Sequence, residues 1–306
     1  MRYEDRVPNL LVAGVTKTGT TSLYWYLTQH PDVCRPKGCK EIDFFTPMRR
    51  GEPPLGDVEA YGAFFAACAG ERYRLDASPQ YFDGGRALVE AVRRYTPNAR
   101  VLVLLRDPVE RLWSHYRDIK SKDKLADNMP FRKFFECGVA VHGTNGSRQQ
   151  HTNFRATSLG CYAEYLRDWF DVFDDRVGVL FHEHLVRDAQ AFTAEICVWL
   201  GIDPAVTRGF DYEVRNRTVD PRSVAFSRFA YAVNRRVGPT LRKVPTAKRV
   251  AREVYAVLNR RGDGEQLGQD DRRAMEHFYA PGIAALRDEL RRRGYDDLPA
   301  WLGGAA

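Results

Sequence analysis

The chain has 306 residues, of which 44% are hydrophobic and 28% charged, enough apolar sequence for one large domain or two small ones. Its formal net charge of +7 attracts anions without selecting among nucleic acid, anionic lipid and a phosphorylated cofactor. No run approaches the roughly 18 apolar residues of a membrane span, and the N-terminus lacks the apolar run of a signal peptide. We therefore expect a cytoplasmic protein without a transmembrane segment.

The six cysteines contain no C-x-x-C pair, and histidines are few. We expect mostly reduced thiols and no metal site. A disulfide between Cys34 and Cys39, around a short loop, is the open alternative.

The first half of the chain alternates predicted strands and helices. The apolar run NLLVAGV at 9–15 predicts a buried strand, and the segment at 20–33 predicts a helix that stops before Pro31. A second strand is expected in 72–82, ending near Asp76, followed by a helix over 85–99 and a third strand over RVLVLL at 100–105.

The pattern continues after this strand. Asp107 and Pro108 mark the start of a helix, whereas 121–158 is polar and reads as a surface connection. A helix over 160–173, a strand over 176–185 and a helix over 188–202 follow.

This alternation predicts an α/β fold with a P-loop-like central parallel sheet of about four to five strands, flanked by helices. We expect a single domain over 1–306, with a core at 9–223 and an arginine-rich helical extension at 224–306.

Two strand-to-helix turns could bind anions, since helix N-termini at the carboxyl edge of a parallel sheet present backbone N–H groups. The first, GVTKTGTTS at 14–22, combines Gly14, Gly19 and Lys17 with threonine hydroxyls. A triphosphate loop places its lysine after the second glycine, but Lys17 lies two residues before Gly19. The turn therefore suits an anion other than a magnesium-bound triphosphate. A strand-to-helix turn without a ligand is the alternative.

The second turn holds Arg106 at the end of the third strand and Ser114 two helical turns later. A guanidinium and a hydroxyl together suit a phosphate. Arg106 paired with a carboxylate is the structural alternative. Two such turns on one sheet favour a ligand with two separated phosphate groups.

The stretches GVTKTGTTSLYWYL and VLVLLRDPVERLWSHYRD resemble the paired cofactor motifs of sulfotransferases that use 3′-phosphoadenosine 5′-phosphosulfate (PAPS). The resemblance implies that Arg106 and Ser114 hold the 3′-phosphate. It also implies that the first loop holds the phosphosulfate through Lys17, Thr18, Gly19, Thr20, Thr21 and Ser22.

Other stretches extend the resemblance to about Leu11–Ser223, over two thirds of the chain. KEIDFF at 40–45 resembles the heparan-sulfate branch, whose glutamate, here Glu41, is the catalytic base. SPQYF at 78–82 resembles a segment of the same branch. The substrate-binding residues implied are Lys40, Phe44, Phe45, Ser78, Tyr81 and Phe82.

The stretches GCYAEYLRDWFDVF and VGVLFHEHL are similar to bacterial members, and we count Tyr162 among the cofactor-binding residues. RNRTVDPRS resembles the basic loop that closes over the cofactor, which implies binding by Arg215, Arg217 and Arg222. A solvated basic loop is the alternative reading of these arginines.

Two departures weaken the case for heparan sulfate as the acceptor. Ala77 stands where that branch often carries a lysine, and the C-terminal disulfide loop of some members has no obvious counterpart.

The resemblance implies sulfuryl transfer from PAPS to a hydroxyl, or less readily an amine, of a carbohydrate or small-molecule acceptor, with PAP (adenosine 3′,5′-bisphosphate) as the product and no metal. Glu41 would take the acceptor proton, and Lys17 would stabilise the leaving phosphate. An ion pair with Lys40 or a nearby arginine is the alternative role for Glu41.

Histidines are weaker candidates. Adjacent helix residues point about 100° apart, so His115 should face away from its neighbour Ser114. His182 and His184 bracket Glu183 in a sparse arrangement that favours a structural role over a metal site.

Two other classes remain as alternatives. A P-loop kinase or NTPase would use ATP with Mg²⁺, and a nucleic-acid binder is suggested by charge alone. We expect no nucleic-acid partner, because the chain lacks a long basic-aromatic stripe. The sequence leaves the acceptor and the oligomeric state open.

Overall fold

The structure, a computed structural model, describes residues 6–122, 124–125, 129–143, 153–213 and 266–303. These residues divide into two compact units. The first contains the described residues up to Pro108, those from Leu159 to 213, and those from Tyr279 onward; the second contains the described parts of 109–158 and 266–278. The single-domain organisation stays a prediction.

The first unit is built on a five-stranded parallel sheet in the order β2-β3-β1-β4-β5. This confirms the predicted sheet. Leu10 of β1 lies opposite Leu75 of β3, and Leu102 of β4 lies opposite Gly178 of β5. The strands are β1 (Leu10–Gly14), β2 (Val33–Cys34), β3 (Tyr73–Asp76), β4 (Arg100–Leu105) and β5 (Val177–Phe181).

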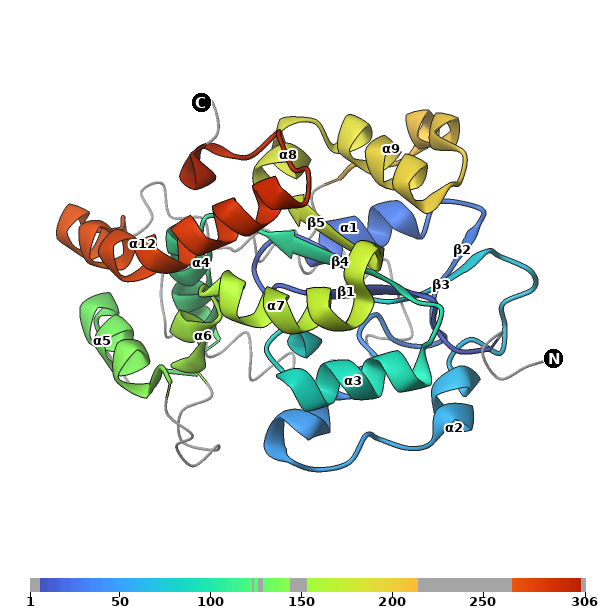
Figure 1. Ribbon diagram of the computed structural model, residues 1–306, viewed down its shortest axis with the longest axis horizontal. Helices are drawn as coiled ribbons and strands as arrows, with labels where there is room; N and C mark the ends of the chain where they lie inside the picture. Colours follow the sequence, from blue (N-terminus) through green and yellow to red (C-terminus); the bar gives the residue numbers. More distant parts are fainter. Residues whose placement is uncertain (1–5, 123, 126–128, 144–152, 214–265, 304–306) are drawn as a thin grey trace. The chain divides into compact units, whose positions relative to one another are not determined.

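Helices cover both faces of this sheet (Figure 1). Alternate residues of β1 point to opposite faces, so Leu10 and Val12 pack with α1 and α9, whereas Leu11 and Ala13 pack with α3 and α7. The α-helices of this unit are α1 (Thr20–Leu27), α2 (Val58–Ala63), α3 (Arg86–Tyr95), α7 (Tyr162–Phe173), α8 (His182–Arg187), α9 (Ala189–Leu200) and the part of α12 (Gln269–Arg292) from Tyr279 onward.

Local sequence explains several helix boundaries. The Asp57 and Asp188 carboxylates accept hydrogen bonds from the backbone N–H groups of Ala60 and Ala191, which caps the N-termini of α2 and α9. Helix α9 ends at Gly201, whose φ of 70° is the left-handed conformation that glycine adopts readily.

The second unit contains the helices that follow β4 in the chain. Trp113, Tyr116, Phe131 and Phe134 pack with one another around its aromatic core. Its helices are α4 (Pro108–Ser121, from Val109 onward), α5 (Phe131–Val141), α6 (Arg155–Ser158) and the first part of α12 (Gln269–Arg292). Helix α12 confirms the helical prediction for the end of the chain.

Four elements differ from the sequence prediction. Helix α5 lies inside the segment interpreted as a polar connection, because Phe131, Phe134 and Phe135 supply one buried face. Strand β2 and helix α2 were not predicted. The chain at His182–Leu185 is helical, so the fourth predicted strand ends earlier, at Phe181.

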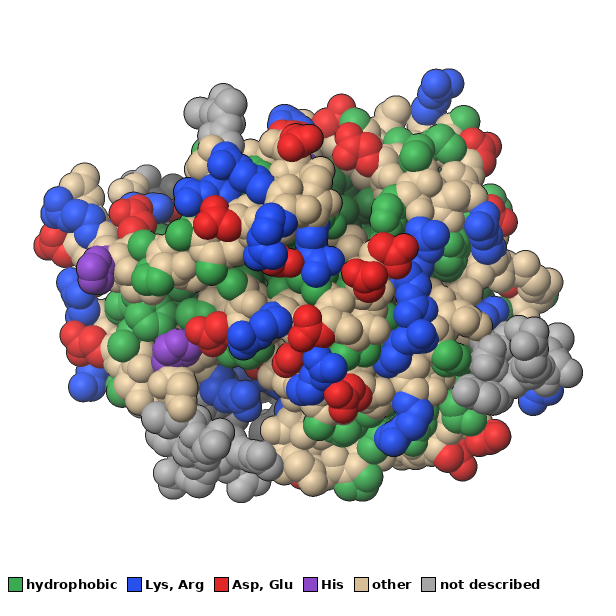
Figure 2. All heavy atoms as spheres, viewed as in Figure 1, with side chains coloured by type: hydrophobic (Ala, Val, Ile, Leu, Met, Phe, Trp, Pro, Cys, Tyr) green, Lys and Arg blue, Asp and Glu red, His purple; other side chains and the backbone are tan. Residues whose placement is uncertain are grey.

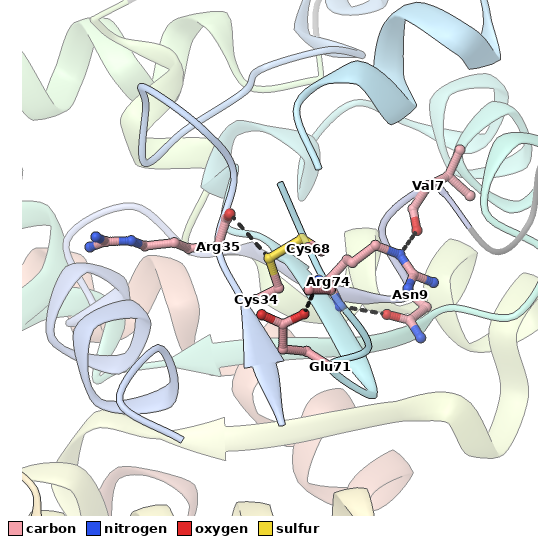
Figure 3. Close-up of a disulfide and its surroundings, with 8 residues drawn as sticks. Val7, Asn9, Cys34, Arg35, Cys68, Glu71 and Arg74 are labelled. Atoms are coloured by element: carbon pink, nitrogen blue, oxygen red, sulfur yellow. Dashed lines mark hydrogen bonds between the residues drawn. A yellow bond between two sulfur atoms is a disulfide. The ribbon is translucent and has the colours of Figure 1, made fainter. Parts of the chain in front are cut away.

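A disulfide joins Cys34 of β2 to Cys68, 34 residues apart in sequence (Figure 3). Four of the six cysteines are reduced, as the prediction of mostly reduced thiols has it, but Cys34 pairs with Cys68 and not with Cys39. The described free thiols are those of Cys39, Cys137, Cys161 and Cys197. Disulfides are uncommon in reducing compartments, so this pair counts against the expectation of a cytoplasmic protein. That expectation stays a prediction.

Among the residues that the structure describes, no helix combines the length and apolar character needed to cross a membrane. Figure 2 shows one face of the molecule, on which lysine and arginine side chains are interspersed with carboxylates. One example of such pairing is Arg86, which forms ion pairs with Glu90 and Asp171.

Candidate active site

The candidate site lies where strand order reverses in the first unit. Strand β1 sits between β3 and β4, and the turns after β1 and β4 leave the same carboxyl edge of the parallel sheet. Crevices at such switch points are where open α/β sheets bind ligands. The turns carrying Lys17 and Arg106 are therefore neighbours at this edge, as the sequence predicted.

Two glycines give the first turn its shape. A Cβ on Gly14 would come within 2.6 Å of the Phe82 Cβ, so a larger residue would push against the core. Gly19 has a φ of 103° and immediately precedes α1, and a Cβ there would lie 3.0 Å from Leu185 and 3.1 Å from His182. The loop thus needs glycine at both ends.

Lys17 adopts a φ of 71°, a left-handed conformation that is rare for a residue other than glycine. Three side chains hold the carbonyl oxygens of this loop. Thr18 Oγ1 donates to Val15 O at 2.7 Å, His182 Nδ1 lies 2.7 Å from Thr18 O, and Arg106 donates to Lys17 O at 3.4 Å. Carbonyl oxygens repel anions, so holding them in protein contacts suits a loop that receives one.

The contact of Arg106 with Lys17 O links the two predicted anion-binding turns directly. Tyr162, only 1% exposed, donates from its hydroxyl to Arg106 O at 2.7 Å. Glu183 Oε1 accepts a 3.0 Å hydrogen bond from Asp107 N. Residues of α7 and α8 thus hold the second turn. Tyr162 contacts the backbone of Arg106, and its predicted contact with the cofactor stays a prediction.

His182 is the first residue of α8. Burial, with a further contribution from the positive charge of Arg106, lowers the pKa of its imidazole. A neutral imidazole with its proton on Nδ1 fits the contact with the Thr18 carbonyl. His184 instead lies 3.8 Å from Asp297. The three residues 182–184 therefore serve separate structural contacts, in agreement with the structural reading of the sequence.

Glu41, the predicted base, lies just before Phe44 and Phe45 in the chain. Glu41 Oε1 is 2.6 Å from Lys40 Nζ, and the Glu41 side chain is 38% exposed. The ion pair that the sequence left as an alternative is present. It leaves the carboxylate accessible, so the pair and a role as base are compatible.

The aromatic residues expected to contact an acceptor belong to the core. Phe44, Phe45, Tyr81 and Phe82 are each at most 1% exposed. The prediction that these four residues contact an acceptor is wrong for this structure, because their rings pack into the core, with Phe45 against both Phe44 and Tyr81. Ser78 is fully buried as well. Lys40 stays a predicted acceptor contact.

Several predicted residues stay predictions. Thr20, Thr21 and Ser22 form the first turn of α1, and Ser114 lies on α4 in the second unit. Arg215, Arg217 and Arg222 lie outside the described residues. Sequence reasoning gave His182 and Glu183 a structural role without naming their contacts, and placed both residues in the fourth predicted strand.

Comparisons with known proteins agree with this geometry. The family model of the sulfotransferase domain matches residues 7–234. Human bifunctional heparan sulfate N-deacetylase/N-sulfotransferase 3 is 27% identical over 208 residues, which cover 65% of this chain and 23% of that protein. The Drosophila melanogaster bifunctional enzyme is 27% identical over 97% of this chain and 27% of its own length. The chain thus spans about a quarter of these relatives.

A solved sulfotransferase from Alicyclobacillus acidocaldarius superimposes with a TM-score of 0.65 at 23% identity, covering 96% of this chain and 98% of that one. This likeness supports the fold. The family match covers well over half of the 306 residues. The chain therefore belongs to the PAPS-dependent sulfotransferase family.

Proposed function

We propose that this protein transfers a sulfuryl group from PAPS to a hydroxyl, or less readily an amine, of a carbohydrate or small natural-product acceptor. The contact of Arg106 with Lys17 O, at 3.4 Å, carries the proposal. It brings together two cationic turns at one sheet edge, the arrangement expected for a ligand with separated 5′ and 3′ phosphates. Both turns follow strands that pair directly.

The residues present fit PAPS. We assign the phosphosulfate to Lys17, the hydroxyls of Thr20, Thr21 and Ser22, the N-terminus of α1, and the backbone of Thr18, whose hydroxyl donates to Val15 O. The 3′-phosphate is assigned to Arg106 and Ser114, with Arg215, Arg217 and Arg222 closing over the nucleotide. When bound, PAPS supplies the activated sulfuryl group and a phosphate leaving group.

In this proposal Glu41 accepts the acceptor proton as the new S–O or S–N bond forms. Lys40, 2.6 Å away, fixes the orientation of the carboxylate. Lys17 and the loop N–H groups stabilise negative charge on the leaving phosphate oxygen. The proposed reaction has PAP as its second product and needs no metal ion.

The test is transfer from isotopically labelled PAPS, measured with excess EDTA, to a panel of acceptors. The panel pairs polysaccharides carrying free amines with N-acetylated ones, and adds hydroxylated small molecules. Label entering an acceptor supports the proposal, and the amine pair decides between O- and N-sulfation. Label entering none of them, together with Mg²⁺-dependent phosphoryl transfer from ATP, would favour the kinase alternative.

A further inference from the structure

A buried carboxylate stands directly behind the segment that carries Glu41. Asp76, the last residue of β3, is fully buried. It accepts three side-chain hydrogen bonds: Ser78 Oγ donates to Oδ1 at 2.6 Å, and the hydroxyls of Tyr61 and Tyr81 donate to Oδ2 at 2.6 and 2.9 Å. A buried carboxylate with this many donors is a fixed polar centre in an apolar core.

Two of these hydroxyls also reach the backbone of the 40–46 segment. Asp43 N donates to Ser78 Oγ at 2.9 Å, and Phe44 N donates to the Tyr81 hydroxyl at 2.8 Å. An ionised carboxylate only accepts, so it takes the single proton of each hydroxyl and leaves the hydroxyl oxygen to accept from the backbone. Asp76 thereby fixes the direction of two hydrogen-bond relays, one from Asp43 N through Ser78 and one from Phe44 N through Tyr81.

The held backbone is in a conformation that needs support. Asp43 has a φ of 55°, in the left-handed region, and Thr46 Oγ1 donates to its side chain at 3.1 Å. Asp43 and Phe44 come two and three residues after Glu41. Loss of either relay would leave a backbone N–H without its acceptor, at half-buried Asp43 or at buried Phe44, which favours a rearranged turn.

We infer that Asp76 is a positioning residue, which acts through Ser78 and Tyr81 to hold the turn at Asp43–Phe44 and with it the orientation of Glu41. This rests on the proposed function for its catalytic consequence. It also gives the SPQYF stretch a role other than acceptor contact: its serine and tyrosine connect β3 to the segment that bears the base.

Tyr61 provides a matched control within the same network. Its hydroxyl donates to the same Asp76 oxygen as that of Tyr81, and both side chains are fully buried. The Tyr61 ring stacks on Phe44, with the ring centres 4.3 Å apart. Among the described hydrogen bonds, that of Tyr81 with Phe44 N has no equivalent at Tyr61. Tyr81→Phe and Tyr61→Phe therefore both remove a hydroxyl from Asp76, and Tyr81→Phe alone breaks a relay.

The experiment compares the two variants with wild type by amide hydrogen exchange over residues 40–46, by kcat in the labelled-PAPS assay, and by PAP affinity. For Tyr81→Phe we expect exchange at Phe44 to speed up about tenfold or more and kcat to fall about tenfold, with PAP affinity unchanged, since a buried N–H left without its acceptor costs about 1.4 kcal/mol or more, which is a factor of about ten. Tyr61→Phe should change exchange and kcat by less than about twofold, although its stability falls comparably.

Equal effects of the two variants on exchange and kcat would overturn the inference, because Asp76 would then stabilise the fold without positioning the turn. Asp76→Asn should reproduce the faster exchange of Tyr81→Phe, and unchanged exchange in Asp76→Asn would also overturn it. The exchange readout does not depend on turnover. Inactive wild-type protein would thus contradict the proposed function while exchange still decides the positioning role.

Discussion

His182 Nδ1 lies 2.7 Å from the backbone carbonyl oxygen of Thr18, the residue between Lys17 and Gly19. The contact ties the start of α8 to the centre of the cofactor loop. It joins segments 164 residues apart, and the sequence alone gives no reason to pair them.

His182→Ala should weaken PAP binding about fivefold, since a buried hydrogen bond contributes about 1 kcal/mol and the Thr18 carbonyl would lose its partner. Isothermal titration calorimetry measures the effect. His184→Ala is the control, because His184 lies two residues away and is directed to Asp297. An equal loss of affinity in both variants would contradict a specific role for His182.

Glu41→Gln should retain PAP affinity and lower kcat about 100-fold or more, since general-base catalysis commonly contributes that much. The measurement is steady-state transfer from labelled PAPS at saturating acceptor. Glu52→Gln serves as the control, because Glu52 is another exposed glutamate of the same region, paired with Arg50. Normal turnover of Glu41→Gln would rule out Glu41 as the base.

The free energy of unfolding of wild type, relative to that of Asp76→Asn, should be larger at low pH than at neutral pH. Burial raises the pKa of Asp76 from 3.8 to about 6, against the lowering effect of its hydroxyl partners. Between these values the folded state binds the proton more tightly than the unfolded state does. This contribution to stability is therefore present below about pH 4 and is lost as pH rises through about 6.

Urea unfolding of wild type and of Asp76→Asn, measured from pH 7 to pH 4, isolates the contribution of Asp76 protonation to the free energy of unfolding. The free energy of unfolding of wild type relative to the variant should rise by about 2–3 kcal/mol over that range. A constant difference would contradict the assignment. The other groups that act on the pKa of Asp76 are retained in both proteins: Ser78, Tyr61, Tyr81 and Asp43.

The Cys34–Cys68 disulfide should stabilise the protein by about 3–4 kcal/mol, the chain-entropy value for a loop of this length. Denaturant unfolding with and without reductant measures the difference, and Cys39→Ser, which removes a free thiol, is the control. Peptide mapping of non-reduced, alkylated protein should recover Cys34 linked to Cys68. Alkylation of both residues in the native, unreduced protein would contradict the pairing and support a reducing compartment.

The parallel sheet and the two cofactor turns could be predicted because their signals are local. Gly14, Lys17 and Gly19 lie within six residues, and Arg106 directly follows an apolar strand. The disulfide could not be predicted, since its cysteines are 34 residues apart and Cys39 offered a nearer partner for Cys34.

The buried network was missed for a related reason. Ser78, Tyr81 and Asp76 are polar, and in sequence they read as surface or site residues; their burial depends on Tyr61 and Phe44, which other segments supply. The stretch KEIDFF shows no strand or helix periodicity, so nothing in it separates the exposed Glu41 from the buried Phe44 and Phe45.

Calorimetry of PAP binding in the presence of EDTA distinguishes a PAPS-dependent enzyme from one that uses ATP with Mg²⁺. Wild type should bind PAP with one site per chain, and Lys17→Met, which removes the charge and keeps an unbranched side chain, should weaken binding about 10- to 100-fold. ATP with Mg²⁺ should bind more weakly than PAP. Absence of PAP binding, or Mg²⁺-dependent ATP binding tighter than that of PAP, would contradict the account.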